Sequence, residues 1–190
     1  MERNIAQVAL FAAMIAALGL VPQITLGFGV PITAQTLGVM LAGAVLGARR
    51  GAAAAGLFLL LVALGLPLLA GGRGGLGVFA SPTAGFALGF PVAAFVTGLF
   101  VERVALRPAG LVAGIGAVLG GIVVLYILGA GGLAIVTGKP LAEAFRLVAV
   151  FIPGDLLKAA ITGMLVQALA RARPQTLAWH RPAGSAQTRL

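Results

Sequence analysis

The sequence predicts an all-α polytopic membrane protein, with six transmembrane helices and both termini in the cytoplasm. Of the 190 residues, 61% are hydrophobic and only 9% are charged, and the mean hydropathy is +1.12. Such values are typical of a membrane protein and not of a water-soluble domain. Apolar runs of spanning length recur along the chain, and the basic residues gather at alternate connections between them.

Each apolar run is long enough, or nearly so, to cross the hydrocarbon core, which takes roughly 17 to 25 helical residues. The second and third runs are short, because the basic turn GARRG at 47–51 divides what would otherwise be one long helix. The six expected spans are residues 5–22, 33–48, 51–70, 84–101, 110–132 and 152–170. Residues 1–170 therefore form one six-helix domain, and residues 171–190 a polar, disordered cytoplasmic tail.

The basic residues also predict the orientation. Nine of them fall on one side of the six-span arrangement and three on the other, with Lys158 inside a span. Because arginine and lysine are enriched in cytoplasmic loops, the side with nine is the cytoplasmic one. The nine are Arg3, Arg49, Arg50, Arg103, Arg107, Arg171, Arg173, Arg181 and Arg189, and the three are Arg73, Lys139 and Arg146. The connections at 25–36, 68–85 and 132–147 are then outward loops.

Several classes of function are disfavoured by composition. The chain has no cysteine, one histidine (His180, in the tail), two serines and four acidic residues, so a serine–histidine site within the membrane cannot be assembled. No apolar run carries two carboxylates, and no G-x-x-x-x-G-K-[ST] phosphate loop is present. We therefore expect no enzyme, no metal and no cofactor. The net charge of +9 reflects membrane sidedness, so we expect no nucleic-acid partner.

Small residues recur at four-residue spacing, which lets helices approach closely in lipid. Ala9, Ala13 and Ala17 form such a row on the first span. For this row, packing within the bundle and contact with a partner both remain open. The glycine pairs are expected to pack within the bundle; they are Gly85 with Gly89, Gly110 with Gly114 and Gly116 with Gly120.

Asp155 and Lys158 are the principal candidate functional residues. They stand three positions apart near the start of the last span, so they share one helix face. A charge inside a span costs about 2.5 kcal/mol or more near the centre, less near the interface, and usually faces a cavity. Pro153 and Gly154 begin the helix and place Asp155 at its positive end. The structural alternative is a self-satisfied ion pair, or a lysine extending to the interface.

Arg73 and the start of the second span complete the candidate site. Arg73 lies in the turn GGRGG, and its guanidinium is suited to a carboxylate; the alternative is an exposed loop arginine. Gln35 and Thr36 begin the second span beside an outward loop, where Thr33 could instead serve as a helix cap. The set suits a ligand with a carboxylate, a compact polar ring and apolar atoms between them.

Three classes of function remain open on these residues. The first is a solute-binding membrane subunit, which predicts tight one-to-one binding. The second is a self-sufficient secondary transporter for a small carboxylate, and the third is an assembly subunit without a ligand. Against the second class, no inverted repeat of broken helices is recognisable. Because no ATP-binding motif is present, any pumping needs a partner or a gradient.

Three ordered motifs resemble the BioY family, the biotin-specific substrate-binding (S) components of energy-coupling factor (ECF) transporters. They are VPITAQTLGVMLAGAVLGARRGA, GLPLLAGGRGGLGVFASPTAGFALGFP and PGDLLKA, and the resemblance covers residues 5 to 170. It implies six helices in the cytoplasmic membrane and capture of biotin without hydrolysis. The implied partners are a transmembrane coupling (T) subunit and ATPase subunits.

The resemblance also implies roles for individual residues. Asp155 would accept from a ring N–H of biotin, Lys158 would donate to the ring oxygen, and Arg73 would pair with the valerate carboxylate. The loop SPTAGF departs from the commoner GPTGGY, so Phe86 would keep an aromatic wall without a phenolic hydroxyl. Ala9, Ala13 and Ala17 resemble the A-x-x-x-A pattern that docks on the coupling subunit.

Overall fold

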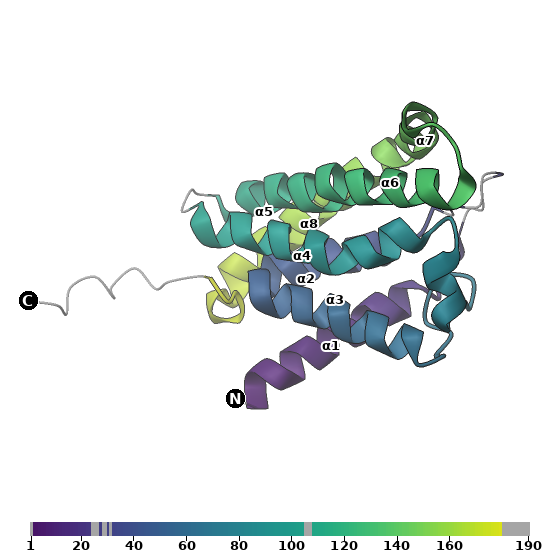
Figure 1. Ribbon diagram of the computed structural model, residues 1–190. Coiled ribbons are helices and arrows are strands. Elements are labelled where there is room, and N and C mark those ends of the chain that lie inside the picture. The colour runs from purple at the N-terminus through teal and green to yellow at the C-terminus, as the bar shows by residue number, and fades with distance from the viewer. Residues whose placement is uncertain (1, 24–26, 28–29, 31, 105–107, 180–190) are drawn as a thin grey trace, which may run out of the picture.

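The computed structural model describes residues 2–23, 27, 30, 32–104 and 108–179, and over these residues the chain is almost entirely helical (Figure 1). Six helical segments form the bundle, which confirms the expected fold; the fifth runs continuously from α5 to α6 and the sixth from α7 to α8. The helices are α1 (Glu2–Leu18), α2 (Gln35–Leu46), α3 (Ala48–Ala63), α4 (Ala84–Arg103), α5 (Ala109–Val118), α6 (Leu125–Thr137), α7 (Leu141–Val148) and α8 (Ile152–Ala172).

Three of these segments are long and apolar enough to cross a membrane by length and composition, namely Ala84–Arg103, Ala109–Thr137 and Leu141–Ala172. The segments α1, α2 and α3 are shorter than the expected spans. The break between α2 and α3 falls at Gly47, whose φ of 79° is readily adopted only by glycine, and α3 ends at Ala63, before the expected end at residue 70. The Glu102 carboxylate then accepts from the Ala48 N–H at 2.9 Å, so an acid from α4 caps the new helix.

Glycines let the helices pack closely within the bundle, as expected. A Cβ added at Gly85 on α4 would lie 2.2 Å from the Leu128 carbonyl oxygen of α6. A Cβ added at Gly120 would lie 2.3 Å from the Ala93 carbonyl oxygen of α4. Gly120 stands in a π-helical turn, η2 (Leu119–Val124), that joins α5 to α6. The backbone of the long fifth segment therefore rests directly against α4.

The connection expected as an outward loop at 132–147 is mostly helical, which corrects that boundary. Helix α6 continues to Thr137 and ends at Gly138, which has a φ of 69°. After Pro140, α7 begins and buries Ala144 and Val148. A 3-10 turn, η3 (Ala149–Phe151), then leads directly into α8. The short amphipathic helix α7 packs across the end of α6 (Figure 1).

The sequence predicts a disordered tail from residue 171, but the chain is ordered against the bundle as far as Trp179. Helix α8 continues to Ala172, and a 3-10 turn, η4 (Pro174–Thr176), returns the chain towards the bundle. Leu177 is buried, and the Trp179 indole N–H donates to the Ala44 carbonyl at 2.7 Å. The end of α2 leaves that carbonyl without a partner in its own helix, so this segment caps α2. Residues 180–190 lie outside the described residues.

Both ends of the described chain lie at the same end of the bundle (Figure 1). Arg3 and Gln7 of α1 line one hollow together with residues 174–178. Arg49, Arg50 and Arg103 also lie at this end, on α3 and α4. Arg107, Arg181 and Arg189 lie outside the described residues. This arrangement agrees with the expected topology, and the assignment of this end to the cytoplasm remains a prediction.

Candidate ligand-binding site

A cavity opens at the end of the bundle opposite the two termini. It lies among the starts of α2, α4 and α8, the middle of the fifth segment and the loop between α3 and α4. Its empty volume, mouth included, is about 600 Å³. All six residues expected to bind the ligand line this cavity. They are Gln35, Thr36, Arg73, Phe86, Asp155 and Lys158.

Asp155 and Lys158 stand on the first two turns of α8 and face the cavity. Their three-residue separation brings the Lys158 Nζ to 2.7 Å from the Asp155 Oδ1, an ion pair whose side chains are only 15% and 6% exposed. The expected start of the helix at this point is observed, since α8 begins at Ile152 with Pro153 in its first turn. The pair is thus self-satisfied, as the structural alternative requires, and it also lines a cavity.

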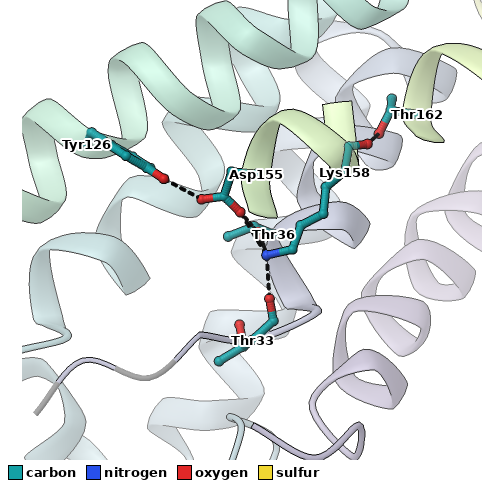
Figure 2. A network of polar contacts seen from close by, with 6 residues as sticks. All are labelled: Thr33, Thr36, Tyr126, Asp155, Lys158 and Thr162. Atoms are coloured by element: carbon teal, nitrogen blue, oxygen red, sulfur yellow. Dashed lines mark hydrogen bonds and ion pairs between the residues drawn. The ribbon is translucent and has the colours of Figure 1, made fainter. Parts of the chain in front are cut away.

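The carboxylate of Asp155 is the centre of a polar network that joins three helices (Figure 2). Its Oδ1 accepts from the Thr36 hydroxyl at 3.1 Å as well as from Lys158. Its Oδ2 accepts from the Tyr126 hydroxyl of α6 at 2.6 Å. A carboxylate offers about four lone-pair sites, so Asp155 retains capacity for one further donor. The remaining site is on Oδ2, which accepts only the hydrogen bond from Tyr126.

Lys158 uses all of its donors within the chain (Figure 2). An ammonium group has three N–H donors, and its nitrogen lies 2.6 Å from the Thr33 carbonyl oxygen, 2.8 Å from the Thr36 hydroxyl and 2.7 Å from Asp155. Thr33 contributes its carbonyl and does not cap α2 through its side chain, because the helix begins after Ala34 with no side-chain cap. An additional acceptor would have to replace one of these three partners.

Tyr126 is a site residue that the sequence analysis missed. It is buried on α6 and contacts Phe86 edge to face, with ring centroids 6.3 Å apart. The available signal was that Tyr126 is the only tyrosine of the chain and stands within an otherwise apolar run, where a hydroxyl requires a partner. Its phenol faces the network from the side opposite Thr36.

Arg73 is held over the cavity by a tight turn. Leu69 and Arg73 exchange backbone hydrogen bonds of 3.0 and 3.2 Å, and Gly71 and Gly72 between them have φ values of 78° and 70°. The guanidinium donates to the Ala70 carbonyl at 3.3 Å and to the Thr83 hydroxyl at 3.1 Å. Partial burial lowers the pKa of Arg73. No acidic side chain of the described residues pairs with it, so the loop arginine is half-buried with donors to spare.

Gln35 lines the cavity, yet its amide is bound to backbone groups. It donates to the Ile15 carbonyl at 3.2 Å and to the Leu68 carbonyl at 3.0 Å, and accepts from the Ala70 N–H at 3.0 Å. The side chain is 1% exposed. Gln35 therefore ties α1 and the Arg73 turn to the start of α2, and it orders the cavity wall.

Apolar side chains separate the polar groups in the cavity wall. Phe86 packs edge to face against Phe151, with ring centroids 6.1 Å apart, and Phe90 and Leu125 lie beside them in the lining. The cavity thus combines a carboxylate–ammonium network, an aromatic wall and a guanidinium. A neutral ring with both donors and acceptors, carrying an apolar chain and an anionic end, fits these groups chemically.

The alanine row on α1 lies outside this site and faces away from the bundle. Ala9, Ala13 and Ala17 are exposed, whereas Ala12 and Ile15 are buried. Packing within the bundle was one of the two possibilities left open for this row. It is seen for the neighbouring face of α1, which carries Ala12 and Ile15, and not for the row. The row itself forms a small-residue surface along the helix.

The bundle and its cavity define a multi-pass membrane protein with a cavity whose lining suits a small polar solute. Over residues 2–175 the sequence matches the BioY family. The chain belongs to the BioY family, as its three motifs indicate.

Two named relatives and a solved structure agree with this assignment. The biotin transporter BioY of Rhodobacter capsulatus is 57% identical over 186 residues, which cover 93% of this chain and 98% of that protein. The biotin transporter BioY of Rhizobium etli is 55% identical over 173 residues, covering 88% and 92%. A crystal structure of the S-component for biotin from an ECF-type ABC transporter superposes with a TM-score of 0.84 at 33% identity, covering 89% of this chain and 91% of that one.

Proposed function

We propose that this chain captures biotin as the S component of an ECF-type transporter in the cytoplasmic membrane. The observation that carries the proposal is the buried Asp155–Lys158 pair in the wall of a cavity that also contains Arg73. The proteins named as biotin transporters at 57% and 55% identity support it, as does the fold shared with an S-component for biotin. Binding at this site requires no chemical change in the ligand.

The ureido ring of biotin presents two N–H donors and one carbonyl oxygen. Asp155 would accept one N–H at Oδ2, which carries only the Tyr126 bond. Lys158 would donate to the ring oxygen after releasing one of its three present partners. A neutral ring brings no further charge into the network, so the desolvated ion pair stays compensated. Thr36 is placed to adjust with this exchange, because it bonds both charged groups.

The valerate carboxylate of biotin would pair with Arg73. Two of the five N–H donors of a guanidinium bind Ala70 and Thr83, which leaves three. A carboxylate bound bidentately is the geometry that suits arginine best. Such an anion would also offset the partial desolvation that lowers the pKa of Arg73. Phe86 and Phe151 would cover the aliphatic chain, and Gln35 would act by holding the loop that carries Arg73.

The exposed row of Ala9, Ala13 and Ala17 would contact the coupling subunit. Small side chains permit a partner helix to approach the backbone of α1, and the opposite face of α1 is already occupied by the bundle. The coupling and ATPase subunits would supply the energy for uptake. The end of the bundle with both termini would face the cytoplasm, and the cavity would face outward.

Equilibrium binding of biotin to the purified, detergent-solubilised chain tests this function. Isothermal titration calorimetry is expected to give saturable binding with one biotin per chain. Thiamine and riboflavin serve as controls, since neither carries both a ureido ring and a carboxylate. Absence of biotin binding by a monodisperse, helical preparation would refute the proposal.

A further inference from the structure

The outer surface of the bundle has a groove between α5 and α8 that takes no part in the cavity described above. The two helices touch at Gly110 and Gly163, where a Cβ on either residue would lie 2.6 Å from the carbonyl oxygen of the other. One turn further along α5 the helices are less tightly packed, because a Cβ at Gly114 would be in ordinary van der Waals contact with α8, 3.7 Å from the Ala159 carbonyl oxygen; Gly114 lines the groove at this point. The empty volume of the groove, open side included, is about 1040 Å³.

The sides of the groove are apolar and exposed. Leu111 and Ile115 of α5 are 58% and 44% exposed, and Met164 of α8 is 63% exposed; Ala160 lies beyond Met164 on the same face of α8. In a membrane protein this surface is in contact with lipid, so the groove is open to an acyl chain along its length. Within a bilayer such a trough gains van der Waals contact when a chain lies in it.

Two hydrogen-bond donors stand at one end of the groove without acceptors. Gln167 accepts from the Gly110 N–H at 2.9 Å through its Oε1, and its amide nitrogen has no acceptor among the described residues. Arg171 follows four positions later, so it shares the same face of α8 and lines the same groove. Arg171 forms no ion pair with the described residues. Both donors lie at the end of the bundle that holds the termini.

The order of these groups along the groove matches the order of groups in a phospholipid. A cation stands at the helix end, a neutral amide donor one turn inward, and an apolar trough beyond it. A phosphate would meet Arg171, an ester carbonyl would meet the Gln167 amide, and an acyl chain would fill the space over Gly114. We propose that the α5–α8 groove binds one anionic phospholipid, with its headgroup at Arg171.

Lipid binding measured by native mass spectrometry tests this proposal. The full-length protein, delipidated in mild detergent, would be titrated separately with dioleoyl phosphatidylglycerol and dioleoyl phosphatidylcholine. Arg171→Gln removes the cation. Gln167→Glu keeps the acceptor for Gly110 and replaces the donor with a negative charge. Gly114→Leu places a side chain in the trough, since a Cβ at Gly114 meets no atom closer than ordinary van der Waals contact.

Matched controls exist at the same end of the bundle and on the same long segment. Arg103→Gln removes a cation from the end of α4, and Gly131→Leu adds a side chain to α6 where a Cβ meets nothing within 4 Å. Far-UV circular dichroism and gel filtration establish that each variant is folded. If Gly114→Leu fails this check, Arg171→Gln and Gln167→Glu decide the outcome.

The wild type is expected to bind one phosphatidylglycerol more tightly than phosphatidylcholine. Arg171→Gln is expected to weaken phosphatidylglycerol binding about fivefold, as for one cation near an anionic headgroup. Gly114→Leu is expected to weaken both lipids, and the two controls neither. Equal affinity for the two lipids in the wild type, or unchanged phosphatidylglycerol binding in Arg171→Gln and Gln167→Glu, would overturn the proposal. A dimer lost on Gly114→Leu with lipid binding intact would assign the groove to a second copy of the chain.

Discussion

Replacing both members of the buried ion pair separates its structural role from its role in binding. In Asp155→Asn the Lys158 ammonium, 15% exposed, keeps its hydroxyl and carbonyl partners but loses its counter-charge. Removing one partner of a buried pair costs 3–5 kcal/mol, and because Lys158 retains some exposure we expect about 3 kcal/mol. Lys158→Met leaves a carboxylate that is only 6% exposed; it still accepts from Thr36 and Tyr126 but loses its counter-charge, so we expect a loss of about 3–5 kcal/mol.

The double variant Asp155→Asn/Lys158→Met carries no uncompensated charge. Its stability is expected within about 1 kcal/mol of the wild type, because replacing both partners of a buried pair is often neutral. Affinity for biotin, unlike stability, should not recover in the double variant. A hydrogen bond to a charged group contributes about 1.5–3 kcal/mol, so each single variant should bind biotin roughly 10- to 150-fold more weakly. The double variant should bind at least as weakly as either single one.

Apparent melting temperature at a fixed scan rate and biotin calorimetry measure the two quantities. Lys139→Met/Glu143→Gln is the matched control, since this pair is 40% and 45% exposed and exposed pairs contribute about 0–1 kcal/mol. It should change neither quantity. If the double variant of Asp155 and Lys158 regains biotin affinity together with stability, the pair does not contact the ligand and the reasoning is refuted.

Three further changes test separate parts of the account. Arg73→Gln should weaken biotin binding by about 1.5–3 kcal/mol in calorimetry yet leave the affinity for biotin amide unchanged; equal losses for both ligands would remove Arg73 from the carboxylate. Ala13→Leu should abolish uptake of labelled biotin in cells with the coupling module while binding persists, and Ala142→Leu on α7 should not; uptake surviving in Ala13→Leu would exclude that interface. Trp179→Phe should lower the melting temperature by removing the bond to Ala44, worth about 1 kcal/mol, without changing biotin affinity; a changed affinity would contradict its placement far from the site.

The spans and the charged pair were predictable because each has a local cause in the sequence. A run of apolar residues has to lie in lipid or in a core, and Gly47 next to two arginines has to interrupt such a run. Asp155 and Lys158 were recognisable because charges inside a span require partners. The sequence also indicated Thr36, because it is a polar residue at the start of the second span, beside an outward loop.

The remaining features depend on contacts between distant segments. The position of Tyr126 opposite Asp155 is set by how the fifth segment rests on α4. The spacing of the glycines predicts that helices pack closely, but it does not tell which glycine meets which helix. Gln35 was predicted in the site from its position, but its amide binds α1 and the Arg73 turn, a pairing invisible along the sequence. The prolines and scattered polar residues after the last apolar run predict a disordered tail, but residues 174–179 are held by hydrogen bonds to the Ala44 and Val45 carbonyls at the end of α2.

The structure of the chain bound to biotin tests the central claim most directly. We expect the ureido ring within hydrogen-bonding distance, about 2.7–3.2 Å, of Asp155 and Lys158, with the valerate carboxylate at Arg73 and Phe86 beside the aliphatic chain. Lys158 should have given up one of its present partners. Biotin bound outside this cavity, or inside it with the carboxylate on Lys158 and the ring at Arg73, would contradict the account.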